Sequence, residues 1–293
     1  MTDGRQRSVL DPVPAPSSVP LLVALLVVLL AACSPGPTSE SPTPSPQASP
    51  SSTPAPADPP PTATAQPRPT SGSCHRLSFD EALSPTAGTG AVPCRKPHTA
   101  ETYAVGTVDN LVDGHLLAID SAQVQQQVAQ TCPARLGTAV GGSLEQQRLS
   151  MLRAVWFTPT VEKSDAGASW YRCDVIVLAG ADALSRVQGS LTGVLDTEQG
   201  RQRYGMCGTA GPDEASFERV LCSEQHSWRA FSVRALPEGR YPGRAAVSRA
   251  GQPCKDAAAA IAEDSLDYQW GFEGPDPDQW AAGQTFIRCW APD

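Results

Sequence analysis

The sequence is poor in lysine, histidine and aromatic residues, and it lacks any basic patch. It has 3 lysines against 19 arginines, and its 30 acidic residues exceed its 22 basic ones, for a net charge of -8. Abundant arginine and alanine with little lysine are typical of a GC-rich genome. Because single charges are scattered among apolar residues, the composition argues against docking to DNA or other polyanions. We expect no nucleic-acid partner.

Catalytic and nucleotide-binding signatures are also missing. The chain contains no Gly-x-Ser-x-Gly, Ser-x-x-Lys or His-Glu-x-x-His pattern and no phosphate-binding loop. The common hydrolase and nucleotide-binding templates therefore find no match. We expect a non-enzymatic protein that holds no cofactor.

An unbroken apolar run covers residues 20–32, and at 13 residues it is shorter than the roughly 20 that a membrane-spanning helix needs. Because Arg5 and Arg7 precede it, we interpret residues 1–32 as a signal peptide. The run ends in Leu-Ala-Ala-Cys33, which resembles a lipobox; the alternative is an ordinary secretory peptide with an accidental cysteine. We expect lipid on Cys33 to anchor the protein to the outer face of the cytoplasmic membrane.

Residues 33–70 form a segment rich in proline, serine and threonine, with 13 of the 29 prolines between Pro35 and Pro69. Nothing in this segment can bury a core, so it is predicted to be a disordered tether. Proline stiffens such a chain toward about 3.1 Å per residue, which gives a reach on the order of 100 Å. That reach suits a protein that works within the cell wall.

Eight further cysteines follow, in two sets of four whose spacings are 20, 38 and 41 residues and then 15, 32 and 35. An even number in an exported chain predicts disulfides. Four cysteines allow three pairings, of which we favour first with second and third with fourth. The first two bracket a short loop, and the third lies where a helix could cover the strand that carries the fourth. The eight are Cys74, Cys94, Cys132, Cys173, Cys207, Cys222, Cys254 and Cys289.

Local sequence indicates that the two sets correspond. In each set a histidine follows the second cysteine by four residues: His98 after Cys94 and His226 after Cys222. Pro159, Gly167, Trp170, Arg172 and Cys173 match Pro275, Gly283, Phe286, Arg288 and Cys289 at identical offsets. We infer a duplicated domain, with one repeat at 71–198 and the other at 204–293.

Each repeat resembles the septum formation domain of actinobacterial membrane proteins and lipoproteins. That pattern runs Gly-Asp-Cys, Val-Pro-Cys-x-x-Pro-His-x-x-Glu, a central cysteine, then proline, glycine and a closing cysteine. The first repeat supplies it from Gly72 through Glu101 to Cys173, with serine in place of the aspartate. The second departs from it at Met206, Leu221 and Arg229 but adds the family's Tyr-Pro-Gly at 241–243. The resemblance implies a link to cell division and no defined chemistry.

Periodicity predicts an α+β fold for each repeat, in which a small antiparallel sheet carries one packed helix. Apolar alternation after each histidine, at Tyr103/Val105 and Phe231/Val233, and again at 171–177 has the period of a half-buried strand. Residues 121–131 and 254–263 favour helix.

The candidate binding residues are His98, Glu101, His226 and Trp228, and we expect no metal site. Because both histidines recur in the duplication, a structural hydrogen bond explains them better than catalysis. Zinc would need reduced thiolates and denser spacing than these cysteines have. The alternative is an enzyme acting on peptidoglycan, with His98 and Glu101 as base and acid in the first repeat alone, because Arg229 replaces the glutamate in the second.

Two further clusters admit a functional interpretation. Five carboxylates could bind calcium, although such a run is more often a solvated loop: Asp264, Asp267, Glu273, Asp276 and Asp278. Four indoles could stack on wall sugars, although burial in a small core is the commoner use: Trp228, Trp270, Trp280 and Trp290. The leading hypothesis is a lipid-anchored envelope protein whose repeats bind a division protein or a cell-wall component.

Overall fold

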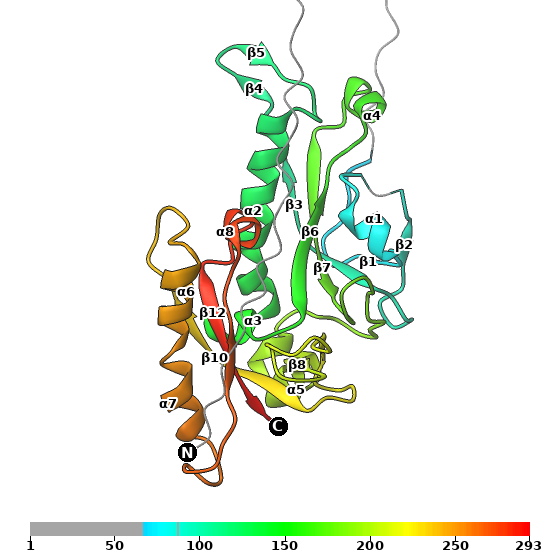
Figure 1. Ribbon diagram of the computed structural model, residues 1–293. Helices are drawn as coiled ribbons and strands as arrows, with labels where there is room; N and C mark the ends of the chain where they lie inside the picture. Colours follow the sequence, from blue (N-terminus) through cyan, green and yellow to red (C-terminus); the bar gives the residue numbers. More distant parts are fainter. Residues whose placement is uncertain (1–66, 87) are drawn as a thin grey trace, which may run out of the picture. The chain divides into compact units, whose positions relative to one another are not determined.

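The computed structural model describes residues 67–86 and 88–293, so the predicted signal peptide, Cys33 and most of the tether lie outside the described residues. The described chain is α+β, with two five-stranded antiparallel sheets flanked by helices (Figure 1). The predicted fold class is confirmed. One sheet belongs to the first half of the chain (residues 71–198) and the other to the second half (residues 204–293).

The first sheet has the strand order β2-β1-β3-β7-β6. Its strands are β1 (Cys74–His75), β2 (Ala91–Val92), β3 (Ala100–Thr107), β6 (Leu152–Phe157) and β7 (Trp170–Val177). The helices of this half are α1 (Phe79–Leu83), α2 (Ala122–Val140), α3 (Leu144–Arg148) and α4 (Val161–Asp165). A separate hairpin joins β4 (Leu111–Val112) to β5 (His115–Leu116).

The second sheet has the order β11-β12-β10-β8-β9. Its strands are β8 (Met206–Gly208), β9 (Arg219–Leu221), β10 (Trp228–Ala235), β11 (Gly271–Glu273) and β12 (Phe286–Pro292). Its helices are α6 (Arg244–Gly251), α7 (Cys254–Ala259) and α8 (Pro277–Ala281), while η1 (Val194–Asp196) and α5 (Glu198–Tyr204) connect the halves.

The two sheets have one topology. When β1, β2, β3, β6 and β7 are matched in chain order with β8, β9, β10, β11 and β12, both sheets show the same neighbours. Register agrees as well, because β3 bulges between Thr102 and Ala104, and β10 bulges between Ala230 and Ser232. These positions coincide when His98 is aligned with His226, so a duplication predicts both the order and the bulge.

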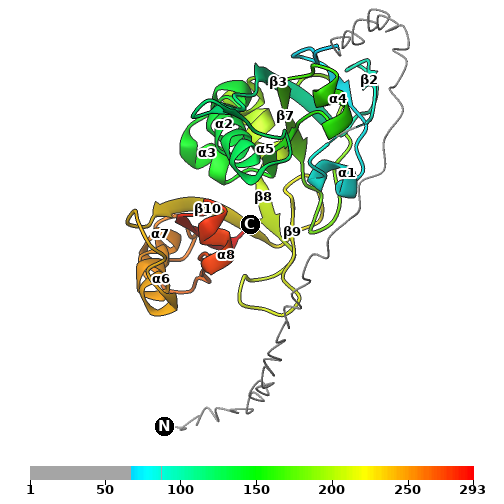
Figure 2. The ribbon, with the colours of Figure 1, turned by 90° about the horizontal axis from the view of Figure 1, so that it is seen from above.

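The first sheet buries both of its faces. Helix α2 lies along one face, and α1 lies on the opposite side (Figures 1 and 2). Strand pairing places Cys74, Glu101 and Val175 on one face because they are direct cross-strand partners. Thr102 and Asp174 pair on the other face. Strand alternation therefore sends one set of polar residues to each side.

The halves are joined by backbone pairing and by a shared core. Met151 N–H donates to the Tyr204 carbonyl over 2.8 Å, and the Arg288 Nε donates to the Arg148 carbonyl over 3.0 Å. One hydrophobic cluster contains Val175 of the first sheet and Trp290 of the second. The boundaries 71–198 and 204–293 stay a prediction.

Each half is closed by two disulfides, paired as first with second and third with fourth. The bonds are Cys74–Cys94, Cys132–Cys173, Cys207–Cys222 and Cys254–Cys289. The favoured pairing is thus confirmed. In each half, the third cysteine lies on a helix (α2 or α7) that this bond fixes to the long strand β7 or β12.

The predicted helices differ from the structure in length. Helix α2 continues past Thr131 and through Pro133 to Val140, whereas α7 ends at Ala259, before the predicted limit. Proline disfavours a helix interior because it lacks an N–H group. Burial of Cys132 and Val140 against the sheet offsets that cost. Each half also has more than the one helix that the pattern predicted.

Candidate functional site

Each half gathers a cysteine sulfur, a histidine and a carboxylate into one small group. Ligand atoms of Cys74, His98 and Glu101 lie within 4.8 Å of one another, as do those of Cys207, His226 and Asp293. The cysteine and the histidine occupy equivalent positions in the two groups. The carboxylate does not, because Glu101 comes from β3 and Asp293 follows β12.

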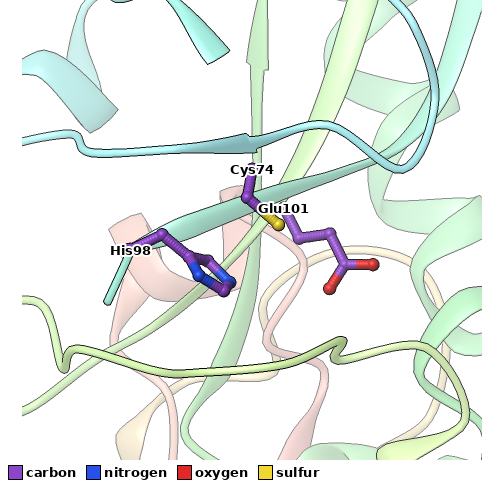
Figure 3. A group of neighbouring side chains, drawn as sticks. All are labelled: Cys74, His98 and Glu101. Atoms are coloured by element: carbon purple, nitrogen blue, oxygen red, sulfur yellow. The ribbon is translucent and has the colours of Figure 1, made fainter. Parts of the chain in front are cut away.

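The first group is closed to solvent. Figure 3 shows the imidazole of His98, the sulfur of Cys74 and the side chain of Glu101 directed toward one space. His98 Nδ1 bonds the carbonyl oxygen of Lys96 at 2.9 Å, whereas its buried Nε2 has no hydrogen-bond partner among the described residues. His98 is 0% exposed and Glu101 4% exposed. A ring bond to the backbone beside the second cysteine agrees with a structural role.

A crossing segment, residues 187–192, covers this group. Val187 and His98 exchange backbone hydrogen bonds of 2.9 and 3.0 Å. The Glu101 carboxylate accepts hydrogen bonds from the hydroxyls of Ser190 and Thr192 and from the N–H of Leu191. These hydrogen bonds hold the crossing segment against Glu101. They also supply the donors that a buried carboxylate needs.

The second group is more open and pairs its charges. His226 Nδ1 bonds the Glu224 carbonyl at 2.7 Å, the counterpart of the His98 bond. Its Nε2 contacts a carboxylate oxygen of Asp293 at 2.7 Å. Arg229, which replaces Glu101, donates to both Asp293 oxygens at 2.8 and 2.7 Å. Hydrogen bonds from Arg229, then those from His226, lower the pKa of Asp293 to about 2 against the opposing effect of burial.

Both groups lack a free thiolate, and the first group also lacks access to solvent. Zinc binds cysteine as the thiolate, and Cys74 and Cys207 are in disulfides. An acid–base pair must reach its substrate, yet His98 and Glu101 are buried beneath residues 187–192. The arrangement can hold a strand, a loop and a disulfide together.

A buried polar relay on the other face of the first sheet was not predicted from the sequence. His75 Nε2 lies 3.1 Å from the hydroxyl of Thr102, which donates to Asp174 over 2.7 Å. Asp174 forms an ion pair with Arg172 at 2.9 Å, and the Arg172 guanidinium lies over the ring of Phe157. The available signal was polar residues at inward positions of strands that otherwise alternate apolar and polar side chains.

Burial is the main cause of the pKa shifts of His75 and Asp174. Desolvation, followed by the positive charge of Arg172, lowers the pKa of His75 to about 4, so the ring is neutral at pH 7. Desolvation raises the pKa of Asp174 to about 6 in spite of its ion pair with Arg172. Keeping the carboxylate of Asp174 charged inside the protein therefore costs folding free energy.

The remaining sequence candidates have packing or capping roles. Trp228 and Trp290 are buried in the shared hydrophobic cluster, which favours a core role for both. The carboxylates of the acidic run are not gathered into a ligand set in the described chain. Glu273 is in an ion pair with Arg219 at 2.6 Å, and Asp276 caps α8.

No helix within residues 67–86 and 88–293 is long and apolar enough to span a bilayer. A protein-family model described as septum formation matches residues 71–289, a segment that holds all eight disulfide cysteines and both sheets except the last three residues of β12. No curated protein and no solved structure matches the chain. The actinobacterial origin, and the idea that each half is a separate copy of the family domain, stay predictions. This match covers most of the chain. The chain therefore belongs to the septum formation family.

Proposed function

We propose that the chain is a lipid-anchored, non-enzymatic envelope protein that binds a division protein or a cell-wall component during septum formation. Membership of the septum formation family supports the link to division. Four disulfides support a location outside the cytoplasm, where oxidised cysteines persist. The lipobox ending in Cys33 supports attachment to the outer face of the membrane.

One observation carries the non-enzymatic part of the proposal. The residues best suited to acid–base work, His98 and Glu101, are buried, and the carboxylate of Glu101 is occupied by three donors from residues 190–192. At the equivalent place in the second half, Arg229 pairs with Asp293. Neither Cys–His–carboxylate group then leaves its carboxylate free to act as a general acid on a glycan, so binding accounts for these two groups better than turnover.

Purified cell wall separates binding from turnover. Wild-type protein and a Glu101→Gln variant are incubated with insoluble peptidoglycan, and released soluble fragments are measured; Glu81→Gln is the exposed-carboxylate control. We expect no release by any of the three. Release by wild type and by Glu81→Gln that is lost in Glu101→Gln would overturn the proposal in favour of an enzyme.

Location and anchoring are tested in cells. A fluorescent fusion of the full chain is expected to gather at division sites, and detergent phase separation is expected to recover wild type in the detergent phase. Cys33→Ala should leave that phase or accumulate as precursor. A uniform distribution of the fusion, or a Cys33→Ala protein that stays in the detergent phase with unchanged mobility, would contradict the proposal.

A further inference from the structure

One end of the first half carries a hollow whose lining is mixed and more apolar than polar. It has a volume of about 570 Å³ and lies between the β4–β5 hairpin and α4, which occupy the same end of the first sheet in Figure 1. Its apolar lining comes from Leu116, Leu117, Ile119, Val161 and Ala168. Clefts of this size, lined mainly by apolar groups, are typical of binding sites.

The second half has aromatic side chains at the corresponding place. The offset that aligns Pro159 with Pro275 places Trp280 opposite Ser164, which lines the hollow. The Trp280 ring lies 6.0 Å from that of Tyr241, edge to face, and its Nε1 donates to the Gly239 carbonyl over 3.1 Å. At this position the second half therefore packs a large aromatic ring, where the first half has the small side chain of Ser164.

The hairpin extends the apolar surface beyond the hollow. Leu111 and Leu116 are direct cross-strand partners and so lie on one face, where they are 61% and 76% exposed. The turn between them, Asp113-Gly114, has positive φ at both positions, 50° and 79°, as a tight two-residue hairpin requires. An apolar pair displayed on a defined turn beside a hollow indicates a contact surface.

The surroundings of this surface are acidic. Five exposed carboxylates lie on the hairpin, at its base or on α4, and none is in an ion pair with another described residue: Asp109, Asp113, Asp120, Glu162 and Asp165. The basic side chains in the same region are Lys163 and Arg68. Such a rim repels anionic lipid headgroups and attracts lysine and arginine.

We propose that the hollow and the Leu111/Leu116 pair bind an extracytoplasmic segment of a partner protein, one that presents apolar side chains beside lysine or arginine. The apolar side chains would enter the hollow, and the basic ones would meet the acidic rim. This inference rests on the proposed function and assigns its binding role to one surface. It also explains why the hairpin belongs to the first half alone among the described residues.

A peptide assay with the full chain in zwitterionic nanodiscs tests the surface. The probes are a fluorescent 12-residue peptide of alternating leucine and lysine and its partner with glutamate for lysine, with empty nanodiscs as blank. We expect the basic peptide to bind at least tenfold more tightly than the acidic one. Leu111→Gln/Leu116→Gln and, separately, Ser164→Trp should each weaken its binding at least tenfold. Leu266→Gln, at a leucine that is 94% exposed in the second half, should bind like wild type.

This inference would be overturned if Leu111→Gln/Leu116→Gln and Ser164→Trp both bound the basic peptide like wild type, or if wild type bound the two peptides equally. Melting temperature is measured for each variant, so that lost binding in a folded protein is attributed to the surface. The cellular fusion distinguishes this failure from failure of the proposed function. If the Leu111→Gln/Leu116→Gln protein gathers at division sites and supports division like wild type, the surface is wrong and the function stands. If wild type does not gather there but binds the basic peptide, the function is wrong and the surface stands.

Discussion

The two halves build one sheet topology around interiors of different polarity. The first half buries a relay of His75, Thr102, Asp174 and Arg172. At the positions equivalent to the first three, the second half has Gly208, Ala230 and Trp290. Because the second half forms the same sheet without these polar groups, the relay is not required by the topology. The halves share the strand order, the strand bulge, the disulfides and the histidine-to-backbone bond.

The carboxylate beside the histidine comes from a different strand in each half. Glu101 on β3 becomes Arg229 on β10, and Asp293 after β12 brings a carboxylate back beside the histidine. In the first half the carboxylate binds a covering segment, and in the second it binds Arg229. The Cys–His–carboxylate grouping thus tolerates different partners.

The largest difference between the halves is expected at the equivalent arginines. Arg172→Met leaves Asp174 buried and unpaired, which should cost about 3–5 kcal/mol in the free energy of unfolding. Arg288→Met removes one hydrogen bond, to the Arg148 carbonyl, and should cost about 1 kcal/mol. Urea unfolding of the full chain measures both. Arg172→Met/Asp174→Asn should recover much of the loss; equal costs at the two arginines would break the contrast.

Disulfides should behave alike in the two halves. Cys132–Cys173 and Cys254–Cys289 span 41 and 35 residues, so removing either pair by double alanine substitution should cost about 4 kcal/mol on loop entropy. Denaturant unfolding compares the variants, and non-reducing mass spectrometry should find no free thiol among the eight cysteines. Costs that differ by more than about 2 kcal/mol, or a bridge between halves, would contradict the equivalence.

The relay should give the first half two opposed pH dependences. The folded pKa of His75 is lowered from 6.5 to about 4, so its contribution to stability is lost as pH falls from about 6.5 to about 4. The folded pKa of Asp174 is raised from 3.8 to about 6, so its contribution is present at low pH and is lost as pH rises through that range. Each amounts to on the order of 3 kcal/mol, and wild type should change little between pH 4 and 6.

Asp174→Asn should remove the opposing contribution of Asp174. The contribution of His75 then acts alone, and the variant should become less stable on acidification from pH 6.5 to 4. His75→Asn should do the reverse and gain stability over the same range. Asp293 of the second half adds a contribution that is present above about pH 4 and is lost toward pH 2, since its pKa is lowered. Thermal melts at several pH values measure these slopes; a flat profile in both relay variants would exclude the opposed pair.

The smallest contrast is expected at the histidines. His98→Ala removes a fully buried imidazole and its hydrogen bond to the Lys96 carbonyl and should cost about 1–3 kcal/mol, whereas the more exposed His226→Ala should cost about 1 kcal/mol. His115→Ala, at an exposed histidine of the hairpin, is the control and should leave the melting temperature unchanged. If both variants melt like wild type but lose a ligand, the structural role is wrong and His98 and His226 mark paired binding sites.

Sequence reasoning predicted the features that recur at fixed spacing. The cysteine and histidine register indicated the duplication and the favoured disulfides, because four covalent ends and a repeated motif leave few arrangements. It did not predict α6, the β4–β5 hairpin or the continuation of α2 through Pro133. The two helical features depend on burial against a sheet, which outweighs local propensity. The hairpin is exposed and has a local signal in its Asp113-Gly114 turn.

By itself, the sequence indicated the α+β class and the two sets of four cysteines, and the recurrence of the histidines favoured a structural hydrogen bond in each half. Only the tertiary structure decided which carboxylate meets which histidine. Glu101 and Asp293 lie at unrelated offsets in the chain and reach equivalent groups through different strands. It also decided that residues 187–192 cover His98, that Ser164 lines a hollow, and that Trp280 packs against Tyr241. Cross-strand register and packing bring these distant residues together, and no pattern along the chain records them.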